Sequence, residues 1–95
     1  QLTEVIRKLQ EKEIAVYAAH LRGAVIYDTC DYKRGTAFLI GNEANGLREE
    51  TADAADASVK IPMAGKVESL NAAVAASILL YEAARQRRAD GEENF

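Results

Sequence analysis

The spacing of apolar residues predicts a helix towards each end of the chain. In residues 1–12, apolar side chains recur at the i, i+3, i+4 and i+7 positions of an amphipathic helix. A longer helix is predicted to begin at Ser69, a good helix-capping residue type, and to reach about Arg87. This helix carries two apolar faces, one made by Leu70, Ala73, Val74, Ser77, Ile78 and Tyr81 and the other by Ala72, Ala76, Leu79, Leu80 and Ala83. A helix of this kind is buried on two sides, in its own fold or against a second subunit.

Short apolar runs between these helices predict a parallel sheet. Strands are expected at residues 14–19, 36–40 and 58–61, because each run is too short for a helix. Residues 24–27 fit either an added strand or part of a loop, and a further helix is expected at about 47–55. Since strands alternate with helices, the sequence predicts an α/β fold with a parallel sheet.

Composition narrows the class of protein. A chain of 95 residues, 48% hydrophobic and 28% charged, suits one small soluble domain. It has no apolar run of about eighteen residues, so a membrane partner is not expected. The net charge of -3 argues against a broad basic surface for nucleic acid, so any RNA contact would be local or made by another part of the protein. The single cysteine, Cys30, and the single histidine, His20, exclude an internal disulfide and a histidine-based metal cluster.

The start of the chain points to a piece of a longer protein. The sequence begins with Gln1 rather than Met and shows no signal peptide, so we interpret its start as a cut. Residues 1–88 are expected to belong to one domain. Residues 89–95 are polar and acidic and are expected to form a disordered tail.

Two polar segments that follow predicted strands carry the candidate chemistry. Residues 38–47 read Phe-Leu-Ile-Gly-Asn-Glu-Ala-Asn-Gly-Leu, and residues 61–71 read Ile-Pro-Met-Ala-Gly-Lys-Val-Glu-Ser-Leu-Asn. Ligands of open α/β sheets bind at the carboxyl ends of strands, so the two segments would form one site. Glu43 could accept hydrogen bonds from a substrate or hold a neighbouring backbone. The alternative is an ordinary turn at the start of a helix.

The second segment could enclose an adenine ring with its backbone groups. Gly65 shapes the loop, and Ser69 and Asn71 stand at a helix N-terminus, which offers free N–H groups and a positive dipole. Three apolar side chains are suitable covers for the ring: Ile61, Met63 and Leu70. A plain strand–loop–helix unit capped by Ser69 is the alternative. No Walker lysine motif or Gly-x-Gly-x-x-Gly is present, so a phosphate cradle is not supported.

Three arginines, Arg85, Arg87 and Arg88, gather at the end of the last predicted helix. They suit the negative end of the helix dipole, and a contact with phosphate is the alternative.

Both segments strongly resemble motifs of the SpoU/TrmH branch of the SPOUT RNA methyltransferases. Residues 38–47 are similar to the second motif of that family and residues 61–76 to the third, in the same order and at the same spacing. The resemblance extends from about residue 1 to Arg87. It implies an α/β domain whose C-terminal region forms a trefoil knot, a homodimer, and a cytoplasmic enzyme that acts on tRNA or rRNA rather than DNA. The implied reaction transfers a methyl group from S-adenosylmethionine to a ribose 2′-hydroxyl.

The resemblance also assigns roles to particular residues. Positions that match cofactor-binding residues of the family are Gly41, Ile61 and Leu70, and Met63 and Gly65 lie in the same loop and are assigned to cofactor binding with them. Positions that match polar active-site residues are Glu43, Ser69 and Asn71.

The first motif of the family, an Asn-x-Gly-x-x-x-Arg-like stretch that carries the catalytic arginine, is absent from this sequence. Arg7, Arg22 and Arg34 lie in the wrong context to replace it. We therefore interpret residues 1–88 as the C-terminal portion of a catalytic domain that is inactive or poorly active alone. The alternatives are a non-catalytic knotted module that dimerises or binds cofactor, and a generic nucleotide-binding α/β domain.

Overall fold

A computed structural model describes residues 1–20, 23–41, 47–62 and 71–91. Its elements in chain order are helix α1 (Leu2–Glu11), strands β1 (Ala15–Ala19) and β2 (Val25–Ile26), a 3-10 turn (Tyr27–Thr29), strand β3 (Thr36–Leu39), helix α2 (Glu49–Ala54), strand β4 (Ala57–Lys60) and helix α3 (Ala72–Ala89). None of the described helices is long and apolar enough to cross a membrane.

The four strands form one parallel sheet in the order β2-β4-β1-β3. Strand β1 lies at the centre, where Val16 and Ala18 are fully buried. A central parallel strand is covered on both faces, so an unbroken apolar run is what its position requires. The predicted α/β fold with a parallel sheet is confirmed.

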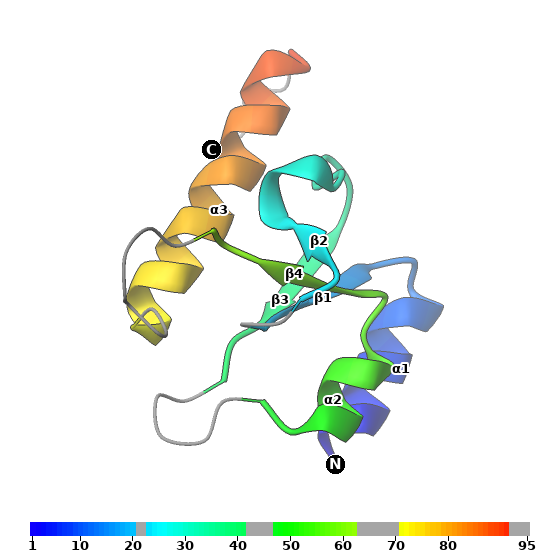
Figure 1. Cartoon of the computed structure of the whole chain (residues 1–95). Helices are drawn as coiled ribbons and strands as arrows, with labels where there is room; N and C mark the ends of the chain where they lie inside the picture. Colours follow the sequence, from blue (N-terminus) through cyan, green and yellow to red (C-terminus); the bar gives the residue numbers. More distant parts are fainter. Residues whose placement is uncertain (21–22, 42–46, 63–70, 92–95) are drawn as a thin grey trace.

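Helices cover both faces of this sheet. Figure 1 shows α1 and α2 together on one side and α3 on the other. Tyr17 of β1 and Phe38 of β3 are register partners, so they share a face, and their rings meet the ring of Tyr32 at 5.0 and 5.1 Å between centroids. Because side chains alternate along a strand, Val16 and Ala18 point to the opposite face. There Ile6 of α1 is also fully buried.

The predicted strands and helices differ from the observed ones by one or two residues, except at the long helix. Residues 24–27, which fitted a strand or a loop, contain β2 and the start of the 3-10 turn. Helix α3 begins at Ala72, and Asn71 is its N-cap. The prediction that Ser69 caps this helix is therefore wrong. Helix α3 also continues to Ala89, and residues 92–95 of the predicted tail lie outside the described residues.

The prediction of two buried faces on α3 is only half confirmed within this chain. One face is buried, and it consists of Ala75, Leu79, Glu82 and Ala83. The other face exposes Val74, Leu80 and Tyr81, with 46%, 58% and 65% of their surfaces accessible. The buried set follows the spacing i, i+4, i+7, i+8 and includes a charged residue, so it matches neither predicted apolar face.

Candidate functional site

Two of the predicted cofactor positions lie at the same edge of the sheet. Parallel strands end together, and β1 separates β3 from β4. Gly41 follows the end of β3 by two residues, and Ile61 follows β4 directly. The two residues therefore flank the carboxyl end of β1, and both are half-buried. This is the position at which open α/β sheets bind ligands.

Helix α3 begins on the side of the sheet where β4 ends, as Figure 1 shows, and Asn71 is its N-cap. Its side-chain Oδ1 accepts hydrogen bonds from the backbone N–H groups of Ala73 at 2.8 Å and Val74 at 3.4 Å. The extended backbone of Asn71 brings this oxygen over the first turn, where those N–H groups lack partners within the helix. Asn71 itself is exposed.

Five predicted site residues lie outside the described residues: Glu43, Met63, Gly65, Ser69 and Leu70. Of the predicted set, the structure therefore places Gly41, Ile61 and Asn71. All three are at the carboxyl edge of the sheet.

A close backbone contact stiffens this edge, and the sequence analysis did not anticipate it. The N–H of His20 donates to the carbonyl of Val59 at 2.9 Å, and the N–H of Ala24 donates to that of Ser58 at 3.0 Å. Between them, a Cβ atom on Gly23 would lie 2.5 Å from the carbonyl carbon of Val59. Only glycine fits such an approach, so the segment after β1 is held directly against the end of β4.

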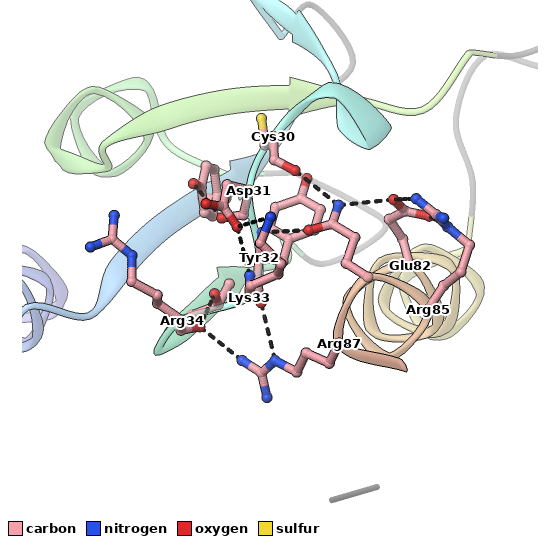
Figure 2. A network of polar contacts seen from close by, with 11 residues as sticks. Cys30, Asp31, Tyr32, Lys33, Arg34, Glu82, Arg85 and Arg87 are labelled. Atoms are coloured by element: carbon pink, nitrogen blue, oxygen red, sulfur yellow. Dashed lines mark hydrogen bonds and ion pairs between the residues drawn. The ribbon is translucent and has the colours of Figure 1, made fainter. Parts of the chain in front are cut away.

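At the opposite edge, α3 is joined to the segment before β3 by side-chain hydrogen bonds, shown in Figure 2. Gln86 accepts a hydrogen bond from the N–H of Tyr32 at 2.7 Å and donates one to the carbonyl of Cys30 at 2.9 Å. The guanidinium of Arg87 donates to the carbonyls of Tyr32 at 3.2 Å and Arg34 at 2.8 Å. The end of α3 thus binds four backbone groups on residues 30, 32 and 34 of this segment.

A buried carboxylate organises this junction. Glu82 is only 7% exposed. Its two oxygens accept hydrogen bonds from Arg85 at 2.9 and 2.8 Å, and one of them also accepts from Gln86 at 2.9 Å. The hydrogen bonds from Arg85 hold the pKa of Glu82 below its usual value of 4.5. Glu82 therefore stays ionised and paired.

Tyr32 fills the space under this junction. It is fully buried, and its hydroxyl donates to the carbonyl of Tyr27. Burial, with the nearby Cys30 thiol, raises the pKa of Tyr32 far above its usual value of 10.0. The phenol is thus neutral and structural.

The sequence analysis also missed the role of the three C-terminal arginines. Arg85 pairs with Glu82, Arg87 binds backbone carbonyls, and the guanidinium carbon of Arg88 lies 5.5 Å from the ring centroid of Tyr81. A polar pair at i, i+4 on the buried face, Glu82 and Gln86, was the available signal. A depression of about 360 Å³ beside this junction is lined by Asp28, Thr29, Cys30, Asp31, Lys33, Arg85, Gln86, Ala89 and Asp90. It lies away from the carboxyl edge and does not belong to the candidate site.

The fold is an α/β domain with a parallel sheet, and three of the predicted site residues lie at the carboxyl edge of that sheet. Comparison with known proteins identifies the family. The model of the SpoU rRNA Methylase family matches residues 1–81. The chain belongs to this family.

The chain is similar to several named proteins. The chain is similar to the tRNA (guanosine(18)-2′-O)-methyltransferase of Thermus thermophilus, with 47% identity over 87 residues that cover 90% of the chain and 45% of the relative. The enzyme of that name from Escherichia coli is 39% identical over 93% of the chain and 39% of its own length. A 23S rRNA (guanosine-2′-O-)-methyltransferase RlmB of Xylella fastidiosa is 38% identical over 90% of the chain and 34% of its own length. The chain spans less than half the length of these curated relatives.

Solved structures give the same fold. The TrmH/SpoU tRNA modifying enzyme of A. aeolicus matches with a TM-score of 0.87 and 34% identity, over 96% of this chain and 47% of that one. The SpoU methyltransferase AviRb from Streptomyces viridochromogenes, solved in complex with AdoMet, matches with a TM-score of 0.81 and 37% identity, over 92% of this chain and 35% of that one.

Proposed function

We propose that residues 1–88 are the C-terminal portion of the catalytic domain of an RNA ribose 2′-O-methyltransferase that uses S-adenosylmethionine. Family membership supports this, as do relatives named for 2′-O-methylation of tRNA and 23S rRNA. The observation that carries the proposal is that Gly41 and Ile61, taken from two separate motifs, flank the same strand end. The implied knot and a cytoplasmic location belong to the same proposal.

The residues at this edge suit an adenosine group. Gly41 has no side chain, which lets a ligand approach the backbone, and Ile61 offers an apolar surface. We assign cofactor binding to these two residues together with Met63, Gly65 and Leu70. Bound there, S-adenosylmethionine supplies the activated methyl group. Glu43, Ser69 and Asn71 orient the ribose and the cofactor.

The chain is expected to bind cofactor without efficient methylation. The 2′-hydroxyl must lose its proton, and the arginine stretch implicated in that step is not in this sequence. In the longer protein, Glu43→Ala and Asn71→Ala should lower transfer of labelled methyl groups to tRNA or rRNA transcripts far more than they lower folding stability. Full rates in both variants would overturn the assignment of these residues.

The test of the cofactor site is titration calorimetry of this chain with S-adenosylhomocysteine, with ATP as the control ligand. Selective binding of S-adenosylhomocysteine supports the proposal, whereas equal binding of both favours a generic nucleotide site. Gly41→Ala should weaken binding, because the added methyl group would occupy the space through which the ligand approaches the backbone. Gly35→Ala makes the same chemical change at the other end of β3, next to the Ile14 side chain, and should leave affinity unchanged. Absence of any binding contradicts a cofactor site formed by this chain.

We also propose that the exposed face of α3 forms a homodimer. Val74, Leu80 and Tyr81 are exposed apolar side chains on a helix whose other side is already buried. In sedimentation equilibrium the chain should have the mass of a dimer, and Leu80→Glu should shift it towards monomer. Leu2→Glu changes a similarly exposed leucine on α1 and should leave the dimer intact. A monomeric wild-type chain at high concentration would refute this interface.

A further inference from the structure

The two elements that end at the candidate site share a junction at their other ends. Helix α3 starts at Asn71 near the carboxyl edge and crosses the sheet to residues 86 and 87, which bind the segment 30–34. That segment leads directly into β3, which ends next to Gly41. Helix α3 and β3 therefore run in opposite directions between the junction and the site.

Gln86 makes a two-point contact that only one orientation of its amide allows. Its Oε1 accepts from the N–H of Tyr32, and its Nε2 donates to the carbonyl of Cys30, as an added strand would do. The same Nε2 donates to the carboxylate of Glu82. A reversed amide would place its oxygen against the Glu82 carboxylate and the Cys30 carbonyl, with no proton between acceptors. Glu82 therefore favours the same orientation of Gln86 that the two backbone groups require.

The two paths from the junction to the site have nearly equal lengths. Arg87 donates to the carbonyl of Arg34 at 2.8 Å, which gives a common starting point. From Arg34 to Gly41 an extended chain covers about 23 Å. From Arg87 back to Asn71 a helix covers about 24 Å. Both elements are stiff, so a shift of α3 along β3 at the junction moves Asn71 relative to Gly41 by a similar amount.

We infer that Gln86, oriented by Glu82, is a positioning residue that sets α3 against β3 and so places Asn71 relative to Gly41. The inference rests on the proposed function, because it gives the junction a role only if the cofactor site lies between those two residues. Gln86 does not touch the site. It acts through the two elements that end there.

The experiment compares two glutamine variants of the chain. Gln86→Leu keeps the approximate size of the side chain and removes both contacts with the 30–34 segment. Gln10→Leu is the matched control, because Gln10 donates to the carbonyl of Ala54 at 3.0 Å and ties α1 to α2 on the other face. Gln10→Leu loses one part-buried, long-range bond to the backbone, and Gln86→Leu loses two together with the bond to Glu82, but only the bonds of Gln86 lie in the junction.

The first readout is amide hydrogen exchange by NMR, which needs no ligand. Gln86→Leu should speed exchange of Ala73 and Val74, the amides capped by Asn71, by between about two- and thirty-fold. The second readout is affinity for S-adenosylhomocysteine, which should weaken within the same range. Gln10→Leu should leave both unchanged, and matched thermal midpoints would show that stability alone is not the cause.

The outcomes separate the two proposals. If Gln86→Leu changes exchange only at residues 30–34, the junction is merely structural and the inference fails. If wild type binds S-adenosylhomocysteine and Gln86→Leu binds it equally well, the inference also fails. If wild type does not bind S-adenosylhomocysteine, the proposed cofactor site fails. Exchange at Ala73 and Val74 then still shows whether Gln86 affects the first turn of α3.

A second variant covers the case in which Gln86→Leu does not fold. Glu82→Gln keeps the shape of the side chain and removes the charge that favours this orientation of Gln86. It should therefore change amide exchange and ligand affinity in the same direction as Gln86→Leu, but by less. Unaltered exchange at Ala73 and Val74 in a folded Glu82→Gln variant would then overturn the inference.

Discussion

The two ends of α3 differ in how they are held. At its N-terminus, the side chain of Asn71 caps the helix through two bonds to the first turn. At its C-terminus, Gln86 and Arg87 bind the backbone of a segment more than fifty residues earlier in the chain. One end is closed by local contacts beside the strand ends, and the other is fastened by long-range contacts.

This difference shows how a small domain can combine a ligand site with rigidity. Binding residues are usually carried by loops on a rigid scaffold. Here Gly41 and Ile61 follow strand ends on the side of the sheet where α3 begins, while the polar junction at the other end of α3 fixes the scaffold. If the two ends of α3 differ in this way, substitutions at one end and at the other should affect different properties of the protein.

The largest effect is expected between the two ends, where α3 packs on the sheet. Leu79→Ala should destabilise the fold by about 2–5 kcal/mol, because Leu79 is fully buried and its removal leaves a cavity. Leu2→Ala is the matched control, since Leu2 is 47% exposed on α1, outside the proposed dimer face, and should cost less than about 0.5 kcal/mol. Urea unfolding followed by circular dichroism measures both. Equal losses would contradict the burial of Leu79 between α3 and the sheet.

The carboxyl edge can be disturbed without touching α3. Gly23→Ala should cost about 1–3 kcal/mol, because its methyl group would meet the backbone of Val59, which cannot move aside easily. In Gly35→Ala the nearest atom is Cγ1 of Ile14 at 3.2 Å, a side-chain atom that can shift, so the loss should be small. Urea unfolding of both variants tests this. A tolerated Gly23→Ala would contradict the close approach of this segment to β4.

The capping role of Asn71 can be separated from its proposed role in the site. Asn71→Ala should cost about 1 kcal/mol through loss of the cap. Asn71→Ser restores a good cap, so stability should recover. Methyl transfer by the longer protein should stay low in both variants, because serine lacks the amide. Recovery of activity with stability would show that Asn71 only caps the helix.

The smallest expected effect is the pH-dependent contribution of Glu82 at the junction to folding stability. The pKa of Glu82 is lowered in the folded state, so its ionised form stabilises the fold above about pH 4.5 and this contribution is lost as pH falls. Glu82→Gln should therefore cost up to about 1 kcal/mol at pH 6 and less at pH 3.5. Glu4→Gln, at an exposed position of α1, should change little at either pH. A loss for Glu82→Gln that does not vary with pH would rule out the ionised pair as its source.

Much of the fold follows from local patterns. The runs 14–19, 36–40 and 58–61 are short and apolar, and each holds a strand of the parallel sheet. Strand order could not be derived, because hydrogen bonds join segments about 20 to 40 residues apart. The helix cap was misplaced for a different reason. Ser69 and Asn71 are both good capping residues, and only the backbone conformation at Asn71 decides between them.

The candidate site was found through its motifs, whereas the junction was not found at all. Gly41 and Ile61 stand directly after apolar runs, so sequence alone puts them at strand ends. Glu82 and Gln86 look like ordinary surface residues of a helix, because polar side chains are usually solvated. Their partners at residues 30 and 32 belong to an irregular segment, and no local pattern connects them.

The strand order has a consequence for how the chain acquires its fold. Among the described strands, none is paired with the strand next to it in sequence, because β1 pairs with β3 and β4, and β2 pairs with β4. Each pairing must close a long loop before any contact compensates for the lost chain entropy. During synthesis the central strand β1 therefore cannot pair on both sides until residues 57–60 have left the ribosome. We expect slow folding, on the order of milliseconds to seconds, even for a chain this short.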